Sequence, residues 1–196
     1  MVNTDKSLID AHLQGDTTAF GEIVHRYGDS LLGYLTRMTG SIEQAEDLFQ
    51  ETFKRVHEKA DTFRGSRIKS WLFAIATNVA IDGFRRNSRL QVTSLNQKLD
   101  CADDEGHEFG AVAVADNSYE PSQKAIMTER KEQVRQALEL LPARQRATLV
   151  LAYFQQLSYP EVAQVLGCSV GTIKTQMYRA LKTLALRLPD ISEDMK

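Results

Sequence analysis

One side of the helix predicted over residues 170–184 gathers side chains that can bind nucleic acid. At 100° per residue this side carries Gly171, Lys174, Thr175, Tyr178 and Lys182, with Arg179 at its edge. Lysine and arginine reach phosphates or guanine edges, and a threonine can contact a thymine methyl group. The spacing therefore predicts a face that reads DNA. A plain amphipathic helix with a solvated charged face is the alternative interpretation.

The segment 157–184 supplies the elements that would present this face. Ser158 and Glu161, three residues apart, form a capping box that begins a first short helix. Gly167 ends that helix, and Ser169 caps the second one, whose apolar side chains fall opposite the charged side. Two helices joined in this way form a helix-turn-helix pattern, whose second helix enters the DNA major groove.

A second group of basic and aromatic residues lies in the loop 62–69 and the predicted helix 70–86. The helix ends in three arginines, Arg85, Arg86 and Arg89. Arginines near a helix C-terminus favour the helix dipole, which is the simple explanation. Beside the aromatic side chains of Phe63 and Trp71, they could instead hold single-stranded nucleic acid.

A polar stripe marks the predicted helix 42–60. One side of this helix carries Glu46, Asp47, Gln50, Glu51 and Lys54, which we expect to be exposed. Spacing alone leaves two readings open, a solvated surface or a site for a specific partner.

Length and composition indicate one or two small globular domains. The chain has 196 residues, of which 42% are hydrophobic and 26% charged, with a net charge of −2. Residues 95–125 carry two basic and seven acidic side chains, whereas 126–196 carry ten basic and seven acidic ones. No apolar run is long enough to span a bilayer and no signal-peptide core is evident, so we expect a cytoplasmic protein without membrane insertion. Cys101 and Cys168 give no disulfide framework.

Three stretches, in this order and spacing, resemble bacterial RNA polymerase sigma factors of the extracytoplasmic-function (ECF) type. They are AEDLFQETF at 45–53, FRGS and KSWLFAIATNVAIDGFRR within 63–86, and LPARQRATLVLAYFQQLSYPEVAQVLGCSVGTIKTQMYRAL at 141–181. The resemblance implies an all-α chain of two small helical domains joined by a flexible linker. The expected divisions are a sigma region 2 domain at 1–94, an acidic linker at 95–125, a region 4 helix-turn-helix domain at 126–188, and a tail at 189–196.

The resemblance also assigns roles. Core polymerase would bind, through the clamp coiled coil of its largest subunit, at Asp47, Gln50 and Glu51. The unpaired minus-ten promoter strand would bind at Phe63, Arg64, Trp71, Asn78, Arg85, Arg86 and Arg89, with Asn78 contacting a base turned into a pocket beside it. The minus-thirty-five element would be read by Gly171, Thr172, Lys174, Thr175, Tyr178 and Arg179. Gly83 departs from the pattern, because a bulky aromatic residue is expected there.

The expected partners are core RNA polymerase (its clamp coiled coil and its flap), promoter DNA and an anti-sigma factor. The acidic side chains of the linker, Asp100, Asp103, Asp104, Glu105 and Glu108, either lie in a basic polymerase channel or form a solvated spacer. A stand-alone helix-turn-helix regulator is the alternative function, and a sigma-like adaptor that no longer melts promoters is a third. We find no nucleophile–base set, phosphate-binding glycine loop or metal-spaced cluster, so we expect no catalysis, cofactor or metal.

Overall fold

The computed structural model describes residues 4–65, 67–94 and 121–187, with side chains described for 4–65, 67–86 and 129–187. Residues 95–120 of the predicted linker, with the five acidic residues named above, and the predicted tail at 189–196 lie outside these ranges. Every regular element in the described part is helical, which confirms the all-α prediction. The elements are α1 (Asp5–Leu13), α2 (Thr17–Thr39), α3 (Ile42–Glu58), η1 (Ala60–Thr62), α4 (Ile68–Ser94), α5 (Pro121–Glu139), α6 (Ala143–Leu149), η2 (Val150–Phe154), α7 (Tyr159–Leu166) and α8 (Val170–Arg187).

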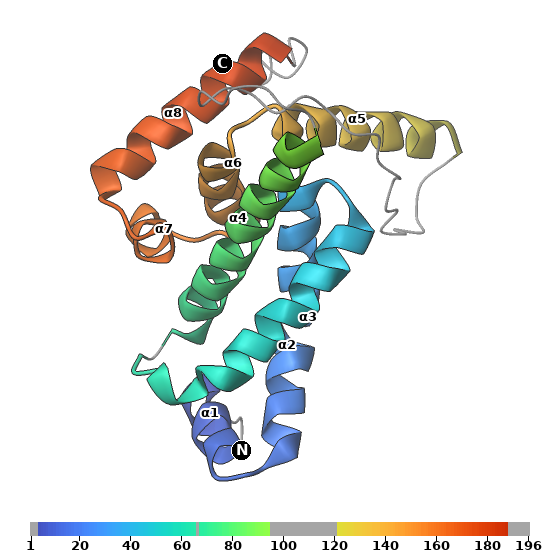
Figure 1. Ribbon diagram of the computed structural model, residues 1–196. Helices are drawn as coiled ribbons and strands as arrows, with labels where there is room; N and C mark the ends of the chain where they lie inside the picture. Colours follow the sequence, from blue (N-terminus) through green and yellow to red (C-terminus); the bar gives the residue numbers. More distant parts are fainter. Residues whose placement is uncertain (1–3, 66, 95–120, 188–196) are drawn as a thin grey trace.

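Local signals explain where α2 and α3 begin and end. The Asp16 carboxylate accepts from Thr18 N at 2.9 Å and so caps α2. Gly40 then ends α2 with φ of 74°, a left-handed conformation that glycine adopts without strain. Ser41 caps α3 by accepting from Gln44 N at 3.3 Å. The chain therefore reverses within two residues, and α3 packs back along α2 (Figure 1).

Helix α4 is the central element of the fold. It packs on α2 and α3 on one side and on α7 on the other, as Figure 1 shows. Its Phe73 ring meets the Tyr34 ring of α2 edge to face at 5.2 Å, and both side chains are fully buried. We name helices α1–α4 with η1 the N-terminal module and α5–α8 with η2 the C-terminal module.

Helices α4, α5 and α6 differ most from the sequence expectation. Helix α4 begins at Ile68 rather than at 70 and continues to Ser94, beyond the predicted end at 86. Helix α5 begins at Pro121, inside the predicted linker, because proline fits the first turn of a helix without losing a hydrogen bond. Helix α6 passes into a π-helical turn, η2, which apolar periodicity cannot distinguish from an α-helix.

Candidate nucleic-acid and partner interfaces

The helix-turn-helix forms through the predicted caps. Glu161 Oε2 accepts from Ser158 N at 2.9 Å and from Ser158 Oγ at 2.6 Å, and these bonds hold the pKa of the Glu161 carboxyl below its usual value. Gly167 ends α7 with φ of 61°, and Ser169 Oγ accepts from Thr172 N at 3.1 Å to cap α8. The turn is therefore specified locally, and the buried apolar side chains of α7 and α8 then pack the two helices together.

The outer face of α8 is open to solvent in the described structure. Lys174, Thr175, Tyr178 and Arg179 are all exposed, and Tyr178 keeps 68% of its surface accessible. Two groups are already engaged: the Thr175 hydroxyl donates to Gly171 O at 3.1 Å, and the Thr172 N–H is used by the Ser169 cap. Lysine, arginine and tyrosine side chains therefore remain as the donors that this face offers to DNA.

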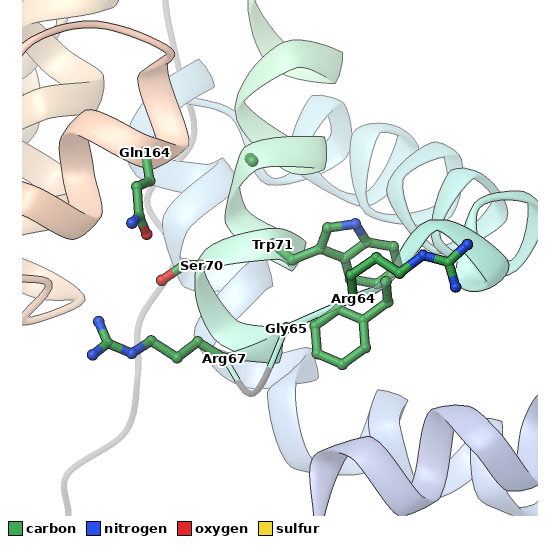
Figure 2. Close-up of a pocket in the computed structure, with 8 residues that line it drawn as sticks. Arg64, Gly65, Arg67, Ser70, Trp71 and Gln164 are labelled. Carbon is green, nitrogen blue, oxygen red and sulfur yellow. The ribbon is translucent and has the colours of Figure 1, made fainter.

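The loop before α4 and the first turns of α4 form a cleft of about 500 Å³ (Figure 2). Its lining consists of Phe63, Arg64, Gly65, Arg67, Ser70, Trp71, Ala74 and Gln164. The Phe63 and Trp71 rings lie with their centroids 5.3 Å apart and their planes tilted by 54°. Arg64 and Arg67 are exposed. Flat aromatic surfaces beside cations suit a single nucleic-acid strand, which binds by stacking and by its phosphates.

Two features of this cleft were not predicted from the sequence. Ser70 is 8% exposed, and its hydroxyl is buried without a hydrogen-bond partner among the described residues. Gln164 comes from α7, so the C-terminal module contributes to the lining. Figure 2 shows Ser70 and Arg67 directed toward the side of α4 where Gln164 lies, while Trp71 and Arg64 lie on the other side. Such tertiary proximity has no signature in local sequence spacing.

The remaining residues predicted to bind the minus-ten strand do not line the cleft. Asn78 is exposed on α4 two turns beyond Trp71, on the same side of the helix but outside the lining. The cleft lies nearer Phe63 and Trp71, and a base pocket beside Asn78 stays a prediction. Arg85 and Arg86 are exposed and lie farther along α4, where Arg85 reaches Asp82 at 4.0 Å. The side chain of Arg89 lies outside the described residues.

An ion pair within the chain engages one of the three residues predicted to bind polymerase on α3. Asp47 and Gln50 are exposed, whereas Glu51 is half-buried and accepts from Arg55 Nε at 2.8 Å. Arg55 also lies 3.8 Å from Asp82 of α4. The charge of Glu51 is thus already balanced within the chain, so Asp47 is the one of the two carboxylates that a basic partner reaches most directly.

The described residues hold neither a metal-ligand cluster nor a helix that could span a membrane. No group of three or more histidine, cysteine, aspartate or glutamate side chains is arranged to hold a metal ion. None of the helices within the described ranges is both long enough and apolar enough to cross a membrane.

The chain combines a helix-turn-helix module with an all-helical module that carries an aromatic and basic cleft. This combination is typical of DNA-binding transcription proteins. Comparison with known proteins gives the family: residues 23–90 match Sigma-70 region 2, and residues 131–184 match Sigma-70, region 4. The chain is 32% identical to the ECF RNA polymerase sigma factor SigW of Bacillus subtilis over 179 residues, which covers 91% of this chain and 93% of the relative. It therefore belongs to the ECF RNA polymerase sigma factors.

Two further comparisons agree. The RNA polymerase sigma-H factor of Pseudomonas aeruginosa is 28% identical, over 92% of this chain and 91% of that protein. A solved structure of the sigma factor RpoE from Bartonella quintana, in complex with the anti-sigma factor NepR, superposes with a TM-score of 0.65 at 25% identity, covering 87% of this chain and 96% of that one. The chain is thus a sigma factor, the subunit that directs RNA polymerase to promoters.

Proposed function

We propose that the three polar surfaces described above divide the work of promoter recognition. Asp47 and Gln50 of α3 bind the clamp coiled coil of core polymerase. The cleft at Phe63 and Trp71, with Arg64 and Asn78, takes the unpaired minus-ten strand. The exposed face of α8 reads the minus-thirty-five element. The observation that carries the proposal is that one chain presents all three surfaces on separate helices, each accessible to solvent at these residues.

Geometry explains why the polymerase is needed. Promoter elements about 20 base pairs apart are separated by roughly 70 Å at 3.4 Å per pair. The 26 residues between Ser94 and Pro121 could span about 85 Å at most. The length of this segment sets only an upper limit on the distance, so a rigid scaffold must hold the two modules apart. Tethering two weak DNA contacts to one polymerase makes the pair selective.

Polymerase capture tests the first surface. Asp47→Lys should abolish retention of this chain by immobilised core polymerase, because the reversed charge meets basic groups of the coiled coil. Asp10→Lys, a charge reversal at an exposed position of α1, serves as the matched control and should be retained. Equal retention of both variants would contradict the assignment of α3.

Promoter melting tests the second surface. Asn78→Ala should leave polymerase capture intact but reduce permanganate reactivity of the unpaired minus-ten strand. A chain that protected a compact duplex site without polymerase would instead be a stand-alone regulator. Unchanged reactivity would place base recognition at residues other than Asn78, or indicate an adaptor without melting activity.

We also propose that an anti-sigma protein regulates this chain and that the chain acts in the bacterial cytoplasm. The sigma factor RpoE from Bartonella quintana, whose structure is similar, has been solved in complex with the anti-sigma factor NepR. Co-purification of this chain with a protein that blocks its capture by core polymerase would test the point.

A further inference from the structure

The C-terminal module packs directly on the loop that would receive the minus-ten strand. Lys69 Nζ donates to the main-chain oxygen of Gln155 at 2.8 Å, across 86 residues of sequence. Arg67 Nη1 donates to Glu161 Oε1 of α7 at 3.1 Å. Gln164, one turn further along α7, enters the lining of the cleft (Figure 2). Helix α7 therefore lies against the basic side of the loop.

A second contact holds the turn after η2 against α2. The Gln155 side chain is 7% exposed and donates to Ser30 O at 3.2 Å. The Arg37 guanidinium lies over the Phe154 ring, 4.4 Å from its centroid. Gln156 then adopts φ of 54°, an uncommon conformation for a residue other than glycine. These contacts and the strained turn fix Gln155 where its carbonyl meets Lys69.

The groups that face the loop resemble those of a nucleic-acid strand in their chemistry. A carboxylate oxygen and a carbonyl oxygen accept hydrogen bonds from Arg67 and Lys69, which are the donors that a phosphodiester would also use. A strand and the C-terminal module cannot bind the same two cations at the same time. The two modes of binding are therefore mutually exclusive on this side of the cleft.

The contact between the C-terminal module and the loop is weak enough for another partner to replace it. Arg67 is 66% exposed, and an ion pair so open to solvent is weak. Ser70 is buried beside α7 with its hydroxyl unsatisfied among the described residues, which opposes closure. A contact of few polar bonds with an unsatisfied hydroxyl suits a surface that alternates between partners.

We propose that the C-terminal module is an intramolecular competitor for the minus-ten strand, closing over the loop through Glu161 and Gln155 until polymerase and promoter separate the two modules. The proposal rests on the minus-ten role assigned to the cleft. In this closed form the face of α8 stays open, so only one of the two DNA-binding surfaces is covered.

Distance measurements test the closure itself. In a chain with Cys101 and Cys168 replaced by alanine, spin labels are placed at Glu58→Cys on α3 and Ala185→Cys on α8, both exposed. The free chain should show one narrow distance, and Glu161→Gln with Gln155→Ala should add a longer population. Identical distributions in the two chains would overturn the proposal. Because no polymerase is present, this result does not depend on the proposed function.

Binding of a random-sequence, fluorescein-labelled single-stranded oligodeoxynucleotide tests the competition. Glu161→Gln keeps the capping box, since glutamine also serves at that position, but removes the charge facing Arg67. Together with Gln155→Ala it should tighten binding about fivefold, because apparent affinity rises with the open fraction. Glu129→Gln, in an exposed part of α5, makes the same change in net charge and should have a much smaller effect.

The two tests separate the possible failures. Equal tightening by Glu161→Gln/Gln155→Ala and by Glu129→Gln would mean that net charge alone governs binding, which overturns the competition. A longer distance population without tighter binding would also overturn it, and would leave closure intact. If core polymerase did not retain the unmodified chain, that result would instead count against the proposed function.

Discussion

The Thr148 hydroxyl of α6 donates to the side-chain oxygen of Gln176 on α8 at 2.6 Å. Thr148 is fully buried, and Gln176 sits on α8 between Lys174 and Tyr178 in sequence. A bond from the neighbouring helix to this position fixes the rotation of α8 about its own axis. It therefore sets the direction in which the DNA-reading side chains point.

Thr148→Val should loosen promoter discrimination as well as the fold. The variant keeps the shape of the side chain but leaves Gln176 without its buried donor, which costs about 1–3 kcal/mol of unfolding free energy. We expect the ratio of affinities for matched and mismatched minus-thirty-five sequences to fall. Thr183→Val, whose hydroxyl bonds only to Arg179 O within α8, is the control. An unchanged ratio for Thr148→Val would limit this residue to a stabilising role.

Lys174→Ala and Arg179→Ala separate base contacts from phosphate contacts. Each should cost about 1–3 kcal/mol of binding free energy if the side chain reads a base, with the loss concentrated at one promoter position. Holoenzyme binding to a set of singly substituted promoters measures this. Arg187→Ala, at the exposed end of α8, provides the control for removal of a positive charge. A uniform loss across all promoters would show that these residues contact phosphates only.

Gly83→Ala should stabilise the N-terminal module. Gly83 lies within α4, and a Cβ there would meet Leu48 Cδ2 of α3 at 3.4 Å, a contact that a small shift relieves. Alanine is favoured over glycine in a helix by about 1 kcal/mol, so urea denaturation should show a gain of up to that size. Gly40→Ala should do the opposite, because its φ is 74° and a Cβ would collide with Glu139. A loss for Gly83→Ala would mean that α3 and α4 cannot adjust.

The close approach of α3 to α4 at Gly83 also explains why this position departs from the family pattern. An aromatic side chain is expected at this position, yet α4 stays helical through it and instead lies close to Leu48 of α3.

The helix termini and the helix-turn-helix were predictable because caps and glycines act on neighbouring residues. The Glu51–Arg55 ion pair is likewise local, at i and i+4, and could have been read from the sequence.

Contacts between segments far apart in the sequence could not be predicted from local sequence signals. Nothing near Ser70 or Gln164 in sequence indicates that the two line one cleft, because they meet only when α7 packs on α4. The same applies to Gln155, whose buried amide reaches Ser30. Helical spacing places Asn78 on the same side of α4 as Trp71, but it could not give the lining of the cleft, which depends on the loop conformation and on α7.

Buried phenols predict a loss of stability at alkaline pH. Burial raises the pKa of Tyr34 well above its usual range, and burial together with a hydrogen bond to Asp5 raises that of Tyr27. A group whose pKa is higher in the folded state holds its proton more tightly there. Its contribution is therefore complete below pH about 10, the ordinary pKa of tyrosine, and is lost as the pH rises above that value.

Tyr34→Phe should flatten this alkaline decline. At neutral pH the variant loses the 2.7 Å bond to Thr77, a cost of about 1 kcal/mol, while the Thr77 hydroxyl keeps its bond to Phe73 O. Above pH 10 the unfolding free energy of the variant should fall less steeply than that of the unmodified chain, as measured by urea denaturation at several pH values. Tyr153→Phe removes a hydroxyl from a side chain that is 74% exposed and controls for the substitution itself. Parallel pH curves for Tyr34→Phe and the unmodified chain would show that deprotonation of this phenol does not drive alkaline unfolding.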